Sequence, residues 1–124
     1  MVMSRILIAI ASLAIGCAGP AGPVPDTGLQ GAVRYGPIQP VCQEGQPCDA
    51  PLQAGFDVER AGLVVARFES DADGRFEVRL LPGTYQVIPD ASAPVMQPRL
   101  QRREVVVGPV GLTVVELAFD TGIR

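Results

Sequence analysis

The chain has 124 residues and a formal net charge of −3; it contains no His and no Trp, and all ten of its basic residues are Arg. The absence of His excludes Ser-His-Asp and Cys-His catalysis, and the absence of Lys excludes a Schiff base or a P-loop. Without His and with only three Cys, we expect no metal and no cofactor. The acidic balance gives no electrostatic basis for a nucleic-acid partner.

The first 16 residues predict a secretory signal peptide. Arg5 gives a weakly basic start, and an apolar run follows from Ile6 to Gly16. A membrane-spanning helix needs about 20 apolar residues, because the hydrocarbon core is about 30 Å thick. The run is too short to span, so we expect residues 1–16 to be removed on export.

Cys17 follows Leu13-Ala14-Ile15-Gly16, a pattern that resembles the lipobox of bacterial lipoproteins. The resemblance implies that Cys17 is acylated and holds the protein on a membrane of the cell envelope, through more than one acyl chain. That membrane is either the outer membrane, at its periplasmic face, or the cytoplasmic membrane, at its outer face. The usual Leu three residues before the Cys is Ala14 here, and ordinary secretion is the alternative.

A stretch rich in Pro and Gly follows the cysteine. It has no periodic apolar face, so it predicts a partly extended linker rather than part of a fold. The chain therefore divides into a signal peptide over 1–16, a lipidated Cys with its tether over 17–27, and one domain over 28–124.

The domain predicts an all-β fold, an antiparallel β-sandwich of about seven strands. Short apolar or alternating runs recur between Gly and Pro residues, and no long run has a helical period. Phe76, Val78 and Leu80 alternate with charged residues and are expected to face the core. A similar alternation runs from Leu52 through Val58. The expected strands are Leu29–Tyr35, Leu52–Arg60, Leu63–Glu69, Arg75–Leu81, Thr84–Ile88, Arg102–Val107 and Leu112–Phe119.

Two turns between these strands have a clear chemical basis. Asp71-Ala72-Asp73-Gly74 predicts a hairpin turn, because Asp bonds its own backbone and Gly accepts a positive φ. Pro82-Gly83 suits the central pair of a type II turn. The acids Glu69, Asp71 and Asp73 do not match the spacing of a calcium loop, so we interpret them as part of the turn.

Four segments resemble the carboxypeptidase regulatory-like domain, a transthyretin-like sandwich. They are Gly31–Val33, Pro51–Val58, Ser70–Phe76 and Leu80–Tyr85, and the resemblance extends over about residues 29–119. It implies a non-catalytic accessory or interaction module. Hydrolases of the same fold rely on active-site His residues, which this chain lacks, so their activity is not expected here.

The chain departs from that family between Gly36 and Ala50, where it carries Cys42 and Cys48. In an oxidising compartment these two cysteines are expected to form a disulfide. The bridge is either a structural staple or the clamp of a rigid recognition loop. In the second case the binding residues are Gln43, Glu44, Gly45, Gln46 and Pro47.

The sequence thus predicts a lipid-anchored, non-catalytic envelope module that binds or scaffolds an envelope protein. The alternatives are a small-molecule or carbohydrate-binding domain and, less favoured, an enzyme that uses carboxylates alone. The densest basic cluster, Arg99, Arg102 and Arg103, is interpreted as a solvated loop.

Overall fold

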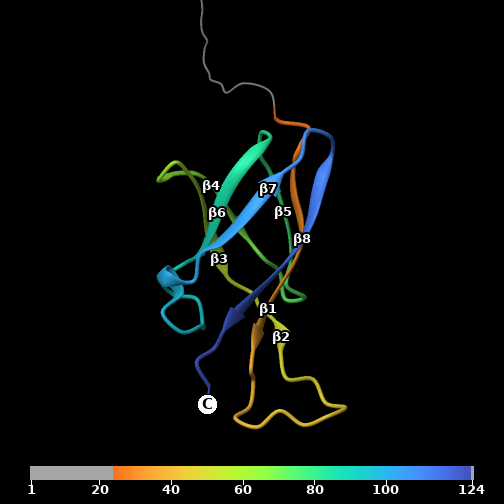
Figure 1. The fold of residues 1–124 in the computed structure, drawn as a ribbon, viewed down its shortest axis with the longest axis vertical. Helices are drawn as coiled ribbons and strands as arrows, with labels where there is room; N and C mark the ends of the chain where they lie inside the picture. Colours follow the sequence, from red (N-terminus) through yellow and green to blue (C-terminus); the bar gives the residue numbers. More distant parts are fainter. Residues whose placement is uncertain (1–23, 124) are drawn as a thin grey trace, which may run out of the picture.

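The computed structural model describes residues 24–123, which form eight strands in two sheets packed face to face (Figure 1). The predicted all-β sandwich is confirmed, and its layering is Ig-like. The first sheet contains β1 (Gly28–Gly36), β2 (Ala50–Pro51), β5 (Arg75–Arg79) and β8 (Leu112–Asp120). The second contains, in spatial order, β4 (Leu63–Glu69), β3 (Gly55–Arg60), β6 (Gly83–Pro89) and β7 (Arg103–Val107). A short 3-10 turn, η2 (Pro98–Leu100), precedes β7.

One strand pair differs from the antiparallel arrangement that we expected. β1 and β8 run parallel and are paired from Gly28↔Leu112 to Gly36↔Asp120. Because β8 follows the whole length of β1, β5 and β2 share the other edge of β1, one after the other. A parallel pair needs a long connection. Here the rest of the domain supplies it.

The strand predicted over Leu52–Arg60 is interrupted, because the chain changes sheets at this point. It leaves the first sheet after β2 and joins the second at Gly55. The buried Ser70 holds the crossover: its hydroxyl donates to the Leu52 carbonyl at 2.6 Å and accepts from the Ala54 N–H at 3.0 Å. The buried polar atoms of the crossover are thereby paired.

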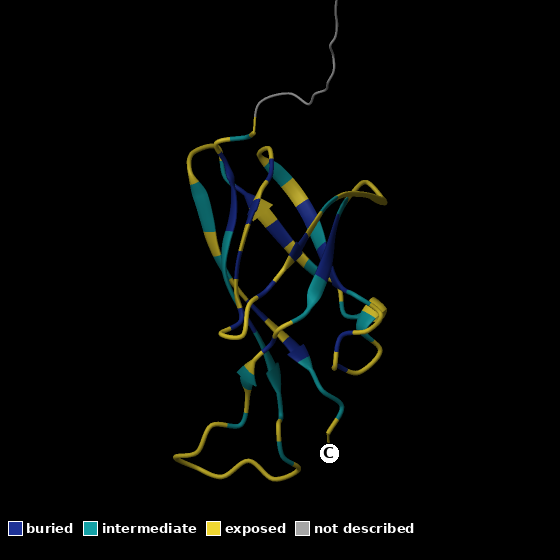
Figure 2. Ribbon diagram, turned by 180° about the vertical axis from the view of Figure 1, so that it is seen from behind, coloured by how far each residue is buried: buried dark blue, intermediate teal, exposed yellow. Residues whose placement is uncertain are grey.

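The core lies between the two sheets, where the inner faces of the strands are buried (Figure 2). All four Phe side chains contribute to it in one contiguous series. Phe119 contacts Phe56, Phe56 stacks on Phe68, and Phe68 stacks on Phe76, with ring centroids 5.6, 5.0 and 4.4 Å apart. Because Phe119 and Phe76 belong to one sheet and Phe56 and Phe68 to the other, this series joins the layers.

The connections gather at two opposite ends of the sandwich (Figure 1). At one end, residues 24–27 lead into β1; we call it the tether end, and it also holds the turns at 61–62, 80–82 and 108–111. At the other lie the connection 37–49 and the segments 70–74 and 90–102; we call it the loop end. β1 runs from the tether end to the disulfide loop, a rise of about 26 Å, and β8 runs beside it over the same length.

The two predicted turns have different outcomes. In the turn before β5, one Asp71 carboxylate oxygen accepts the N–H groups of Asp73 and Arg75, both at 2.9 Å, and Gly74 has a φ of +77°, so the tight turn is confirmed. The predicted hairpin is wrong, because β4 and β5 belong to different sheets and the turn carries the chain from the second sheet to the first. Gly83 also has a positive φ, but at +150° it lies far from the value of about +80° that a type II turn requires. Pro82-Gly83 therefore makes a bend rather than that turn.

Candidate binding site at the disulfide loop

The predicted disulfide between Cys42 and Cys48 is confirmed, with the two Cα atoms 5.4 Å apart. This spacing is ordinary for a disulfide. The bridge closes the tip of the connection between β1 and β2, whose residues are exposed from Pro40 to Pro47. The loop is therefore clipped and fully presented to solvent.

Hydrogen bonds fix the base of this loop to the ends of β1 and β8. The Ile38 N–H donates to the Cys48 carbonyl at 2.8 Å. Thr121, just after β8, donates its hydroxyl to the Pro37 carbonyl at 2.6 Å and its N–H to the Gly36 carbonyl at 3.0 Å. The parallel β1–β8 ladder thus continues into the loop and positions it.

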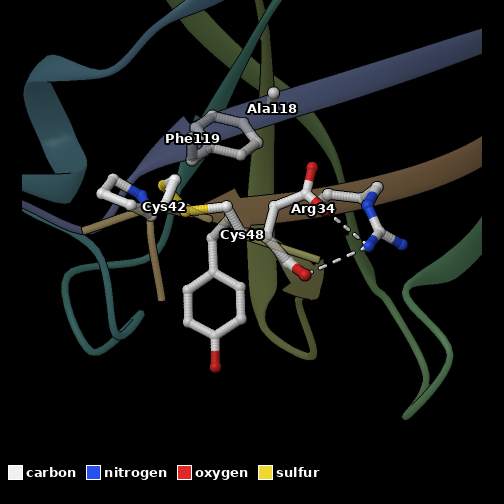
Figure 3. Close-up of a pocket in the computed structure, with 9 residues that line it drawn as sticks. Arg34, Cys42, Cys48, Ala118 and Phe119 are labelled. Atoms are coloured by element: carbon white, nitrogen blue, oxygen red, sulfur yellow. Dashed lines mark hydrogen bonds and ion pairs between the residues drawn. A yellow bond between two sulfur atoms is a disulfide. The ribbon is translucent and has the colours of Figure 1, made fainter. Parts of the chain in front are cut away.

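A cavity of about 410 Å³ lies at the loop base, between the ends of β1 and β8. Figure 3 shows the ring of Phe119 beside the Cys42–Cys48 bridge, with Arg34 on the other side. The volume of this cavity is at the small end of the range for ligand sites, about 300–1,000 Å³. The cavity combines two aromatic residues and two sulfur atoms with one ion pair. The lining residues are Arg34, Tyr35, Gly36, Pro37, Cys42, Cys48, Asp49, Ala118 and Phe119.

The ion pair in this cavity joins Arg34 and Asp49, with Arg34 Nη2 2.7 Å from Asp49 Oδ1. The hydrogen bond from Arg34 holds the pKa of the Asp49 carboxyl below its usual value, and the same bond raises the pKa of Arg34. Asp49 is therefore ionised at neutral pH, a state that accepts hydrogen bonds and donates none. This arrangement suits binding of a polar group rather than donation of a proton.

The residues predicted to bind, Gln43 to Pro47, lie at the exposed tip and do not line the cavity. A tight turn shapes the tip: the Gln46 N–H donates to the Gln43 carbonyl at 3.1 Å, and Gly45 has a φ of +82°. Cys42 and Cys48 alone are shared by tip and cavity. The structure thus offers two adjacent surfaces, a rigid polar tip and a hollow behind it.

Sequence reasoning missed a buried acid on the outer face of the second sheet. Alternation along β3 turns Asp57 away from the core, yet its side chain is only 9% exposed. Arg67 on β4 pairs with one carboxylate oxygen, and Arg99 pairs with the other at 3.0 Å. Arg99 also donates to the Pro89 carbonyl. The segment 90–102 is thus held over the sheet.

The basic cluster that we interpreted as a solvated loop has specific partners. Besides Arg99, Arg102 pairs with Glu59 at 3.2 Å. Arg103 lies 4.8 Å from the centre of the Phe119 ring and donates to the Ala118 carbonyl. The alternation of buried and exposed positions in this region gave no sign of these contacts, because they depend on how the segment crosses the sheet.

Cys17 and the predicted signal peptide lie outside the described residues. Within residues 24–123, His, Cys, Asp and Glu side chains form no group of three or more that would hold a metal ion. In the same range, no helix has the length and apolar composition needed to cross a membrane.

An all-β sandwich is the class that this geometry defines, and solved structures share this fold. A DUF3823 family protein from Bacteroides ovatus is 19% identical over 77% of this chain, with a TM-score of 0.54. A second, from Parabacteroides merdae, is 18% identical over 78%, with a TM-score of 0.50. The matched regions span 44% and 47% of those chains, so the likeness concerns the fold of one part of each. No protein-family model and no curated protein sequence matches the chain.

Proposed function

We propose that the protein is a lipid-anchored, non-catalytic module of the cell envelope that binds another envelope protein through the Cys42–Cys48 loop. The observation that carries this proposal is the placement of the loop at the end opposite to residues 24–27 (Figure 1). A domain held through Cys17 presents its loop away from the membrane and toward a partner.

The rigidity of the loop supports the same role. The disulfide, the tip turn and the hydrogen bonds from Thr121 order the loop before any partner arrives. Ordering costs about 0.5–1.5 kcal/mol for each flexible side chain that binding immobilises, so a preorganised loop binds with a smaller loss.

We also propose that the domain is of the carboxypeptidase regulatory-like, transthyretin-like type. The segments that carry the resemblance include the tight turn before β5 and the Pro82-Gly83 bend before β6. In that family the domain is usually an accessory module, in agreement with a binding role.

The anchor is tested by replacing Cys17 with Ala. The variant is expected to lose acyl labelling and to leave the membrane fraction, because the lipid on this residue is the proposed attachment. A variant that stays on membranes without acyl label would contradict the anchor.

The contact site is tested by in-cell crosslinking with Gln43, Glu44 and Gln46 replaced by Ala and both cysteines kept. We expect the captured partner to be lost while folding is unchanged. The matched control replaces Gln53 and Glu104, exposed residues outside the loop, and should capture as the wild type does. Equal capture by all three proteins would rule out the loop tip.

A second candidate function is favoured by the cavity at the loop base, which is large enough for a small polar ligand. A panel of sugars and small organic acids should then raise the melting temperature, and Phe119→Leu should reduce the shift. A panel without effect, together with partner capture, would leave the first function alone.

A further inference from the structure

The connecting segments of the tether end and of the loop end differ sharply in charge. Among the segments of the tether end, 24–27, 61–62, 80–82 and 108–111, the one ionisable residue is Asp26. The segments of the loop end carry five acids and two Arg: Glu44, Asp49, Asp71, Asp73, Asp90, Arg99 and Arg102. The connecting segments of the tether end are therefore nearly uncharged, and its basic groups, Arg60 and Arg79, lie on the strands beside them.

Large apolar side chains are exposed at the tips of the tether end. Leu63 opens β4 and is 70% exposed, Leu81 between β5 and β6 is 61% exposed, and Val110 between β7 and β8 is 86% exposed. Val24, at the point where the chain reaches the domain, is exposed as well. Val41 and Leu100 are exposed at the loop end too, so what distinguishes the tether end is that its exposed apolar tips lie in or beside nearly uncharged segments.

A small recess of about 240 Å³ lies at this end and adds basic groups to the apolar surface. Pro25, Val65, Leu81 and Tyr85 line it together with Arg60 and Arg79. The Arg60 guanidinium lies 5.4 Å from the centre of the Tyr85 ring, and Arg79 pairs with Glu77. Arginine above an apolar and aromatic floor is the arrangement found at the boundary between lipid tails and phosphate headgroups.

The length of the tether places this end close to the bilayer. Seven residue steps separate Cys17 from Val24, so the connection spans at most about 25 Å. We propose that the tether end is a lipid-facing surface, in which Leu63, Leu81 and Val110 enter the headgroup region and Arg60 and Arg79 meet lipid phosphates. This inference rests on the proposed anchor at Cys17. The surface orients the domain and holds the loop clear of the membrane.

The absence of Trp from the chain allows a direct test. Each of three full-length variants, Val110→Trp, Leu63→Trp and Val41→Trp, carries a single fluorophore. Val41 is 70% exposed but lies in the disulfide loop, so it is the matched control. The full-length proteins, purified from cells that process lipoproteins, are reconstituted in vesicles of phosphatidylethanolamine and phosphatidylglycerol, with and without lipids brominated in the acyl chain. Flotation first establishes that the proteins are on the vesicles.

For proteins that float, we expect the emission at positions 110 and 63 to shift to the blue and to fall about twofold with brominated lipid, because these tips sit at the boundary of the acyl chains. Emission at position 41 should not change. Proteins that float but show no quenching at any of the three positions would overturn the lipid-facing surface and leave the anchor intact. The same holds if the tips are shielded because two copies of the protein cover each other's tether ends. Proteins that carry no acyl chain and do not float would overturn the anchor, and the surface inference with it.

Discussion

Asp57 helps to tie the segment 90–102 to the second sheet, because Arg99 of that segment and Arg67 of β4 both pair with its carboxylate. We predict that Asp57→Asn lowers the free energy of unfolding by about 2 kcal/mol, since hydrogen bonds to a charged group are lost at a buried position. Urea denaturation measures the change. The control is Glu77→Gln, which breaks the exposed pair with Arg79 and should cost less than about 1 kcal/mol. Equal losses would show that Asp57 is not a special contact.

Asp49 gives the loop base a dependence on pH. Arg34 lowers its pKa in the folded protein, so the ion pair contributes above the unfolded pKa of about 3.9 and is lost as the pH falls through the folded value. We predict that Asp49→Asn alters the amide NMR shifts of Cys48 and Ile38 at neutral pH, and that wild type and variant converge in acid. A difference that persists in acid would assign the effect to packing rather than to charge.

At the scale of the elements, the β1–β8 ladder depends on close backbone approach at Gly31. A Cβ at this position would lie 1.7 Å from the Val115 carbonyl oxygen. We predict that Gly31→Ala destabilises the domain by several kcal/mol, or prevents folding, because neither strand can move without breaking the ladder. The contrast is Gly108→Ala, between β7 and β8, where φ is not positive and the nearest atom to a Cβ is the Thr113 hydroxyl oxygen at 3.5 Å. Thermal unfolding followed by circular dichroism should give Gly31→Ala a much lower melting temperature than the contrast variant.

The disulfide shapes its loop more than it supports the fold. Closing a loop this short restricts the unfolded chain by about 2 kcal/mol. Replacing both Cys42 and Cys48 by Ser should therefore lower stability by about that amount and leave the far-ultraviolet spectrum unchanged. Loss of the β spectrum would mean that the bridge is required for the fold.

Much of this element structure follows from local sequence. The turn at Asp71–Gly74, the alternation of Phe76 and Val78, and the Cys42–Cys48 pairing were predictable because each depends on neighbouring residues. The break between β2 and β3 was not, because Leu52 and Ala54 keep an alternating pattern while the chain changes sheets.

The parts that could not be predicted depend on segments far apart in the chain. Nothing local to β1 or β8 shows that they lie side by side and parallel. The cavity combines the ends of these two strands with the loop, so the pattern of the chain gave no sign of it. The burial of Asp57 likewise requires Arg99 to arrive from a later segment.

At the scale of the whole molecule, the domain has two opposite ends, and the parallel strands β1 and β8 both run between them. In our proposals the tether end faces lipid and the loop end faces a partner. The two are separated by the length of β1, which pairs along both of its edges with β8, β5 and β2.

This arrangement determines how the protein bears mechanical tension. A pull between the tether and the loop is carried by the covalent backbone of β1, which is already extended, so little chain is stored along that path. In single-molecule stretching, attachment near residue 24 and at Glu44 should release only a few nanometres of length. Attachment near residue 24 and at Ile123 should release about tenfold more, because almost the whole domain lies between these points. Equal releases of length would refute this role of β1. The expected difference would mean that β1 lengthens very little when it is pulled between the proposed membrane anchor and the proposed partner.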